Sequence, residues 1–423
     1  MKTVVVGGGV IGLACAFALA HDGHDVTVVE ASPDSLRGAS VHNAGWVVPA
    51  MADPVPAPGM VATGLKMMLD RKSPLYIRPT LSPRRLNLLY QLARHCTPAQ
   101  FEHGVAALAA LAHTSISGVD RWAAMGVTFE SSRTNGLILV TAQMDKARHM
   151  LDDIQRHHDP DARLLGPSEM RGLEPALTGD FAAGVSCEDQ RCIAPETLIR
   201  SLVDACSGMG VTIRYSTAVR GIRVSSGARA AAQLGDGSEI DGDVVVLAAG
   251  AATGRLARQL GTALPVFPGK GYGIDLPAPR VTLNRAVYLT ERKVAVSPTP
   301  GRIRLSGTME IGARSGRISQ LRVKGIRDAG VHAFGDWVDA ATPMNTFTGD
   351  RPMTPDGLPI IGFLPGFENV LVATGHQMLG ITLAVPTGEA IAETIRTGRA
   401  PDHVKALAPE RFIHYSKSGG SNA

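Results

Sequence analysis

Residues 3–30 carry the pattern that most restricts how this chain can fold. Val4–Val6 is a β-branched run typical of a buried parallel strand. It is followed by glycines at the spacing G-x-G-x-x-G, namely Gly7, Gly9 and Gly12. Residues 14–20 suit a helix that stops at Gly23, and residues 26–29 are a second strand-like run. This order of strand, glycine turn, helix and strand predicts a βαβ unit that binds a dinucleotide.

Each glycine of this unit has its own task. Gly7 permits the tight turn, Gly9 lets a pyrophosphate approach the backbone, and Gly12 lets the helix pack closely on the strand. Free N–H groups at the helix start would face the phosphates, where the helix dipole favours negative charge. Glu30 stands 18 residues after Gly12, near the roughly 20 expected of an acid that binds a ribose 2′-OH.

Two simpler interpretations of this segment exist. The glycines could form a tight turn in an ordinary α/β domain. The uncharged residues 3–20 also have the minimum length of a membrane helix. Three consecutive glycines and the strand that follows argue against the membrane helix. Because the unit starts at residue 3, we expect no separate targeting peptide.

Composition narrows the class of protein. A chain of 423 residues is long enough for two or three domains with a large core. Its charged and hydrophobic fractions, 19% and 44%, are those of an ordinary globular protein. The net charge of +4 is small and the basic residues are scattered, so nucleic-acid binding has no support. Five irregularly spaced cysteines indicate no metal site, and we expect free thiols in a reducing cytoplasm.

The middle of the chain is expected to be helical first and strand-rich later. Apolar residues recur every three or four positions along 105–122, within a helical stretch over 60–125, and predict a buried face. A peripheral membrane contact of residues 60–92 stays open as an alternative. Residues 126–140 predict two strands joined by a hairpin turn at Asn135-Gly136.

The remaining elements follow from alternation and turn residues. We predict a helix over 143–158, and a helix and a strand within 195–214. An antiparallel meander over 224–240, a buried strand over 243–250 and a helix over 254–260 should follow. The last third should hold four strands within 264–307, a helix over 320–340, and a strand at 370–374 followed by a helix to about 397.

Five segments together resemble one protein family. They are the N-terminal βαβ unit with Glu30, the turn Ser40-x-x-Asn43-Ala44-Gly45, Val219, the strand end 247–250, and the pair 351–357 with 375–380. With them the chain resembles the D-amino acid oxidase superfamily of FAD-dependent oxidoreductases, and within it the bacterial D-amino acid dehydrogenases.

This resemblance implies an α/β fold with two domains. A Rossmann-type FAD-binding domain would be discontinuous, and an α+β substrate domain would hold a mixed or antiparallel sheet. The FAD-binding domain would comprise 1–50, 190–260 and 345–415, the substrate domain 51–189 and 261–344, and a flexible tail 416–423.

The resemblance also implies where FAD lies. The isoalloxazine ring would lie between the turn 40–47 and the loop 376–382, and the adenine near Val219. A helix N-terminus at 380–382 would place positive potential at the pyrimidine end of the flavin. The expected cofactor residues are Gly7, Gly9, Val10, Ile11, Gly12, Glu30, Ala31, Ser40, His42, Asn43, Ala44, Gly45, Val47, Val219, Ala248, Ala249, Gly250, Met378, Leu379, Gly380, Ile381 and Thr382.

The implied reaction is oxidation of a D-amino or cyclic imino acid. A hydride passes from the α-carbon to flavin N5 while the amine is neutral, so no protein base is assigned as a catalytic residue. Electrons then pass to a quinone or another carrier. Arg351 matches the family position that pairs with the substrate carboxylate, a task that suits a guanidinium fork. Tyr272 and Tyr288 are candidates for the substrate pocket, with a place in the core or on the surface as an equal alternative.

Several alternatives stay open. Arg351 could instead form a structural salt bridge with Asp350 or Asp356. Strand 303–307 has no lysine, whereas some oxygen-using relatives place one over the flavin, and this favours a dehydrogenase over an oxidase that releases peroxide. A FAD-binding subunit of a larger dehydrogenase is another alternative. His42 stands three residues before Gly45, where some relatives carry a histidine bonded covalently to the flavin.

The expected location is the cytoplasm, with at most a peripheral contact at the inner membrane face.

Overall fold

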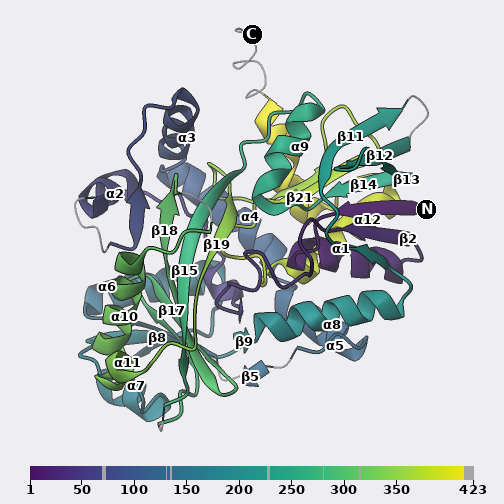
Figure 1. The fold of residues 1–423 in the computed structure, drawn as a ribbon. Helices are drawn as coiled ribbons and strands as arrows, with labels where there is room; N and C mark the ends of the chain where they lie inside the picture. The colour runs from purple at the N-terminus through teal and green to yellow at the C-terminus, as the bar shows by residue number, and fades with distance from the viewer. Residues whose placement is uncertain are drawn as a thin grey trace.

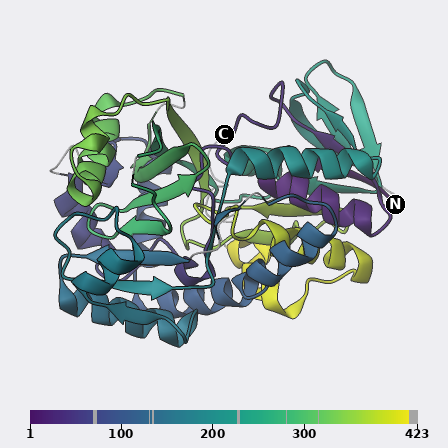
Figure 2. The same cartoon turned by 90° about the horizontal axis from the view of Figure 1, so that it is seen from below.

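Two large sheets organise the molecule. The computed structural model describes residues 1–68, 73–129, 131–133, 136–225, 229–279, 281–313 and 316–413. Figures 1 and 2 show one sheet with the N-terminal strands on the right and the other sheet on the left. Helices cover both, so the predicted α/β fold with two kinds of sheet is confirmed.

The first sheet is the nucleotide-type sheet. Its strand order is β10 (Thr212–Arg214), β2 (Asp25–Val29), β1 (Lys2–Val6), β14 (Val244–Leu247), β21 (Val370–Thr374) and β20 (Ile360–Phe363). Neighbouring strands are parallel except at the edge, where β20 is antiparallel to β21. Val5 belongs to the core on one face and Val4 and Val6 to the core on the other. Burial on both faces explains the unbroken β-branched run.

Helices cover one face of this sheet and a small meander covers the other. The first face packs against α1 (Val10–His21), α8 (Pro195–Gly208) and α12 (Ala384–Thr397). The second face packs against the antiparallel strands β11 (Val219–Ser225), β12 (Arg229–Leu234) and β13 (Glu239–Gly242) and against α9 (Thr253–Gln259). The meander and these helices were all predicted from the sequence and are confirmed.

The second sheet is mixed and has nine strands. Its main path is β19 (Asn345–Met353), β15 (Phe267–Pro277), β18 (Arg302–Ile311), β17 (Val294–Thr299), β16 (Ala286–Leu289), β6 (Leu137–Thr141), β8 (Ala183–Cys187) and β7 (Arg163–Leu165), with β4 (Leu75–Ile77) added beside β18. Only the β16–β6 and β18–β4 pairs are parallel. One face packs against α7 (Pro167–Leu173), α10 (Gln320–Phe334) and α11 (Trp337–Ala340).

The other helices, the small third sheet and the 3-10 turns pack around these two sheets. They are α2 (Met60–Met68), α3 (Pro83–Arg94), α4 (Pro98–Ala112), α5 (Ser115–Ala124), α6 (Met144–His157), the small sheet of β3 (Trp46–Val47), β9 (Arg191–Ile193) and β5 (Ser131–Arg133), and the 3-10 turns η1 (Pro49–Met51), η2 (Gly250–Ala252), η3 (Asp402–Leu407) and η4 (Pro409–Phe412). Leu108 of α4 and Trp122 of α5 are buried against the first sheet, which confirms the apolar stripe as core. None of the described helices is long and apolar enough to cross a bilayer.

Three predictions about local structure are wrong. The strands β5 and β6 exist but form no hairpin, because β5 pairs with β9 while β16 and β8 occupy the two edges of β6. Asn135, the first turn residue, lies outside the described residues. The helical stretch 60–125 contains the strand β4, and the helix over 320–340 breaks at Gly335, whose φ is +89°. Non-local pairing with β18 explains β4, and the left-handed glycine explains the break.

The division into domains at the predicted boundaries stays a prediction. The predicted tail 416–423 lies outside the described residues. None of the five cysteines, all of which lie in the described part of the chain, forms a disulfide.

Candidate functional site

Both sheets contribute to the wall of one cavity of about 1210 Å³. Val6 of β1, Val29 of β2 and Thr374 of β21 reach it with the carboxyl ends of their strands. In an open parallel sheet this edge is where ligands bind. The opposite wall is the face of the nine-stranded sheet that α10 does not cover, and single side chains from its strands line it.

The glycine turn has the shape of a phosphate cradle. A Cβ on Gly7, whose φ is +115°, would lie 2.4 Å from the Ala248 carbonyl oxygen, and one on Gly12 would lie 1.9 Å from the Gly7 carbonyl oxygen. These two glycines are therefore required by the protein's own packing. A Cβ on Gly9 would meet only Ser40 Oγ, at 3.4 Å. The protein's own packing therefore does not explain why residue 9 is a glycine. A ligand that lies close to the backbone would explain it.

The acid at the end of β2 lies beside this turn. Glu30 accepts hydrogen bonds from the backbone N–H of Gly8 at 2.7 Å and of Ser32 at 2.8 Å. The carboxylate is thereby fixed at the edge of the cavity, where the spacing from Gly12 predicts a ribose contact.

Most of the predicted cofactor residues come together at the cavity. The lining includes Gly7, Gly9, Val10, Ile11, Glu30, Ala31, Ser40, His42, Asn43, Ala44, Val219, Ala248, Ala249, Gly250, Met378, Leu379, Gly380, Ile381 and Thr382. Gly12, Gly45 and Val47 are not part of it. Gly12 packs on Gly7, and Gly45 and Val47 hold the turn 40–47 on β9 through the Ile193 N–H to Gly45 carbonyl bond and the β3–β9 pair.

The turn 40–47 and the loop 376–382 are bonded to each other. Asn43 Nδ2 donates to the Met378 carbonyl at 3.0 Å, and Thr382 Oγ1 donates to the Trp46 carbonyl at 2.9 Å. The predicted helix start at 380–382 is wrong, because residues 380–383 form turns and α12 begins at Ala384. Thr382 is thus free to bond the neighbouring turn rather than cap a helix.

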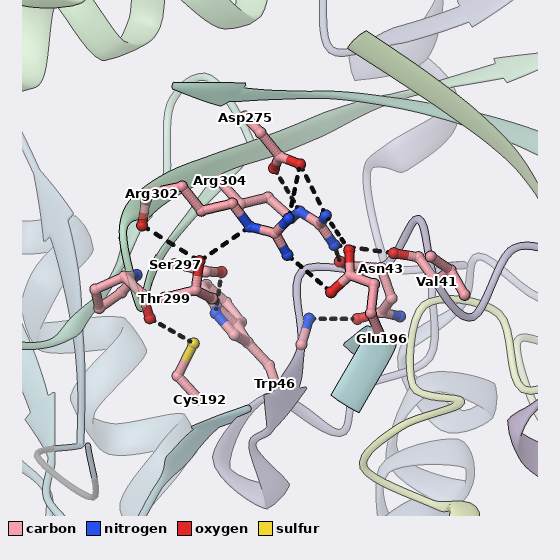
Figure 3. A network of polar contacts seen from close by, with 12 residues as sticks. Val41, Asn43, Trp46, Cys192, Glu196, Asp275, Ser297, Thr299, Arg302 and Arg304 are labelled. Atoms are coloured by element: carbon pink, nitrogen blue, oxygen red, sulfur yellow. Dashed lines mark hydrogen bonds and ion pairs between the residues drawn. The ribbon is translucent and has the colours of Figure 1, made fainter. Parts of the chain in front are cut away.

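A buried arginine joins this turn to the nine-stranded sheet. Arg304 of β18 is 1% exposed and donates to the carbonyls of Val41 and Asn43, both at 2.9 Å. Its guanidinium also pairs with Asp275 of β15 and Glu196 of α8, both at 2.7 Å (Figure 3). Sequence reasoning missed this network. The alternation of Arg302 and Arg304 with apolar residues was the available signal, because it places both arginines on one face of β18.

Arg351 lies on β19 and its guanidinium rests over Gly271 of β15. A Cβ on Gly271 would lie 2.2 Å from Arg351 Cζ, so only glycine leaves room there. Nη1 donates to the Thr308 carbonyl at 2.9 Å. Burial lowers the pKa of Arg351 to about 10, against an opposing effect of Tyr288, so the group stays cationic at neutral pH.

The predicted structural salt bridges of Arg351 do not form. Asp356 pairs with Arg411 at 2.7 Å. Within the described part of the chain no carboxylate lies within ion-pair distance of Arg351. Among the residues that the structure describes, the Thr308 carbonyl is its one acceptor, so the remaining N–H groups of Arg351 are open to the cavity that it lines.

The two predicted tyrosines differ in position. Tyr288 of β16 lines the cavity, and its ring meets that of Trp46 edge-on at 6.1 Å. Tyr272 does not lie with it. It is 2% exposed in the core beneath the sheet, and its hydroxyl bonds to Glu310. Side chains alternate along β15, so the cavity side of Gly271 puts Tyr272 on the opposite face.

Strained backbone and unpaired polar atoms also concentrate here. Lys293, Thr308 and Gln377 have φ values of +52°, +58° and +51°, and all three line the cavity. Such strain in residues other than glycine often marks functional sites. Four buried atoms of the lining have no hydrogen-bond partner: Ser306 Oγ, Thr308 Oγ1, His376 Nδ1 and Gln377 Oε1. Burial lowers the pKa of His376 to about 3, so its imidazole is neutral.

A lysine stands at the cavity although strand 303–307 has none. Lys293 belongs to the turn before β17 and lines the cavity. A Cβ on Gly307 would lie 3.0 Å from its carbonyl oxygen, so the two segments are adjacent. The sequence argument from a missing lysine considered one strand only, and pairing with β17 brings a lysine from another segment.

The comparison with known proteins decides the family. The model of the family described as FAD dependent oxidoreductase matches residues 2–394. The chain belongs to this family. A D-amino acid dehydrogenase of Xanthobacter autotrophicus is 33% identical over 421 residues, which are 95% of this chain and 96% of the relative.

Solved structures share the fold. Glycine oxidase from Geobacillus kaustophilus superimposes with a TM-score of 0.74 at 24% identity, covering 97% of this chain and 99% of its own. L-proline dehydrogenase from P. horikoshii gives a TM-score of 0.75 at 18% identity, covering 98% of each chain. The protein is thus an FAD-dependent oxidoreductase, as the resemblance implied. The open face at Gly9 and the unpartnered atoms of the loop 376–382, His376 Nδ1 and Gln377 Oε1, fit the cofactor.

Proposed function

We propose that this enzyme oxidises a D-amino or cyclic imino acid as a dehydrogenase. One observation carries the proposal: a permanent cation, Arg351, held on the wall opposite the glycine turn with N–H groups free for a ligand. A guanidinium fork suits the carboxylate of an amino acid. The name of the relative from Xanthobacter autotrophicus supports both the D-configuration and the dehydrogenase reaction.

The residues at the cavity would orient rather than deprotonate the substrate. FAD, when bound, would supply the hydride acceptor, and a quinone or another carrier would take the electrons. Arg351 would hold the carboxylate, and Tyr288 would close the pocket beside it. His376, the first residue of the loop 376–382, is neutral and adds no charge to the cavity. The predicted cofactor residues that line the cavity are proposed as FAD contacts, with Val219 at the adenine.

An oxygen-using oxidase is the second candidate function. Lys293 favours it, because a lysine at the cavity removes the sequence argument for a dehydrogenase. A non-catalytic FAD-binding subunit is disfavoured by the free guanidinium N–H groups of Arg351. In a chain that served only as the FAD-binding subunit of a larger dehydrogenase, a residue that binds an amino acid would have no function.

A peripheral membrane contact stays part of the proposal. Val61 of α2 and Leu86 and Tyr90 of α3 are 46%, 50% and 62% exposed. Exposed apolar side chains on neighbouring helices suit the surface of a membrane that carries a quinone.

One experiment tests the function and a second separates the candidates. The yellow holoenzyme should bleach under anaerobic conditions when D-amino or cyclic imino acids are added, and L-isomers should act more slowly. Absence of bleaching by every acid in such a panel would contradict the proposal. Oxygen consumption during turnover distinguishes the two candidates: a dehydrogenase should consume little oxygen and reduce an artificial quinone quickly.

A further inference from the structure

Besides Arg351, the wall formed by the nine-stranded sheet holds a cation, Lys293, that the proposed reaction does not use. Lys293 directly precedes β17, and the register Val294 to Gly307 carries it opposite Thr308 of β18. Within the described residues it forms neither an ion pair nor a hydrogen bond. Its Nζ lies 5.9 Å from the centroid of the Tyr288 ring. An ammonium group has three donors, and here all three are available to a ligand.

Lys293 and Arg351 share a neighbour. Arg351 lowers the pKa of the Tyr288 hydroxyl, opposing its burial, and Lys293 lies over the ring of the same tyrosine. The two cations are therefore placed around one side chain of the wall. Arg351 already accounts for the α-carboxylate of an amino acid, which leaves Lys293 without an assigned ligand.

Two hydroxyl groups beside Lys293 also lack partners. Ser306 and Thr308 are 6% and 7% exposed, and their side-chain oxygens are buried at the cavity with no hydrogen bond. Buried polar atoms are rarely left unpaired, and each unpaired one calls for an explanation. Both residues are on β18, one strand away from Lys293. The ammonium and the two hydroxyls thus form one cluster of donors.

Apolar side chains lie next to this cluster. Leu139 of β6 and Ala295 of β17 flank the cluster in the sheet, and Ile154 of α6 lies on the same cavity. Asp53, a carboxylate of the lining that raises the pKa of Lys293, already has a partner, because its Oδ1 lies 2.9 Å from His158 Nε2. Partial desolvation and the nearby Lys146 lower the pKa of Lys293, while Glu291 and Asp53 oppose this. A bound anion would stabilise the charged form of Lys293.

We infer that Lys293, Ser306 and Thr308 bind a second carboxylate, so that the substrates are amino acids with an acidic side chain, such as D-aspartate and D-glutamate. This inference rests on the proposed function, because Arg351 must take the α-carboxylate. It deepens that function by naming the substrate class. Lys293 is then a residue that determines specificity.

The test compares acids of similar size and different charge. Anaerobic flavin reduction by D-glutamate, D-glutamine and D-norvaline is followed in the wild-type holoenzyme and in Lys293→Met. A hydrogen bond to a charged group is worth about 1.5–3 kcal/mol, so the preference for D-glutamate over D-norvaline in kcat/KM should be about 10- to 100-fold. Lys293→Met should remove this preference and leave D-norvaline within about twofold.

Lys146→Met is the matched control. Lys146 contributes to the field at Lys293 and pairs with Glu291 at 3.1 Å, but it does not line the cavity. Its replacement should leave the preference nearly unchanged. Ser306→Ala should lower the rate with D-glutamate more than the rate with D-norvaline, with unchanged FAD content.

Three outcomes would overturn the inference. Equal use of all three acids by the wild type would contradict the acidic substrate class while leaving the proposed function intact. A uniform loss for all three acids in Lys293→Met, or a loss confined to reoxidation by oxygen, would assign Lys293 to the flavin or its oxidant instead. No bleaching by any amino acid would remove the proposed function and this inference with it.

Discussion

The two walls of the cavity are built in different ways. The wall with the glycine turn consists of short continuous segments, 7–12, 40–47 and 376–382, and the glycine turn itself presents mainly backbone. The opposite wall consists of single side chains from separate strands, among them Tyr288, Ser306 and Arg351. A wall that binds through backbone is encoded locally, whereas a wall of side chains depends on strand register. We therefore expect the wall with the glycine turn to lose function when bulk is added and to tolerate other side-chain changes. We expect the opposite wall to lose function when one of its side chains is removed or exchanged.

The largest expected effect is on the backbone wall. Gly9→Val should abolish FAD binding, because the new side chain would project from a position where only Ser40 Oγ is near. The fold should persist, since packing does not require this glycine. The flavin absorbance per protein and the circular dichroism spectrum measure both. Gly172→Val is a control, because a Cβ there meets nothing within 4 Å. A folded, fully yellow Gly9→Val protein would refute the cofactor assignment.

The next largest effect is expected at Arg304, which links the two walls of the cavity. Arg304→Met leaves the carboxylate of Asp275, which is 1% exposed, without its main partner and removes two donors to the turn 41–43. Breaking a buried pair costs about 3–5 kcal/mol, so the free energy of unfolding should fall by about that amount. FAD affinity should fall too. Urea unfolding and flavin titration measure these changes.

Arg302→Met is the matched control for Arg304→Met. Arg302 pairs with Glu196 at 2.8 Å and, more distantly than Arg304, with Asp275 at 3.5 Å, and a quarter of its side chain is exposed. Partly exposed pairs contribute about 1 kcal/mol or less. If both variants lost the same stability, the special role of Arg304 as the link between the walls would be wrong.

The side-chain wall should respond most to the loss of Arg351. Arg351→Ala should lower kcat/KM for the best D-amino acid by about 10²- to 10³-fold, because removing one partner of a buried ion pair costs about 3–5 kcal/mol. FAD content should remain near wild type. Arg351→Lys should rescue poorly, because an ammonium lacks the planar fork. Activity within about threefold of wild type would refute the carboxylate role, since the expected energy implies far more.

The contrast between the walls also explains what the sequence could predict. The βαβ unit is contiguous, so its residue types and spacing predict a dinucleotide site directly. The turn 40–45 and the loop 376–382 are also contiguous, so a resemblance to a known family could place them at the flavin. The position of Tyr272 could not be predicted, because the face on which a strand residue lies depends on register. Lys293 was missed for the same reason: it comes next to 303–307 only through the β17–β18 pairing. Arg304 was missed because its partners Glu196 and Asp275 are distant in sequence.

The smallest expected effect belongs to a buried side chain of the backbone wall. His376 is 2% exposed, its Nε2 lies 2.9 Å from Thr387 Oγ1, and its Nδ1 has no partner. Burial lowers its pKa to about 3, against about 6.5 in the unfolded chain. Above pH 6.5 the group is neutral in both states and the pH does not change its contribution.

Below pH 6.5 the unfolded chain gains a proton at His376 that the folded protein does not bind, so stability falls as the pH falls towards about 3. Each pH unit in this window costs about 1.36 kcal/mol, which gives about 2 kcal/mol at pH 5. His376→Gln keeps a polar side chain that does not titrate. The difference in unfolding free energy between pH 7.5 and pH 5, measured with urea in excess FAD, should therefore be about 2 kcal/mol smaller in His376→Gln than in wild type. Equal differences in the two proteins would mean that His376 is protonated in the folded state. The backbone wall would then carry a positive charge, as the opposite wall does at Arg351 and Lys293.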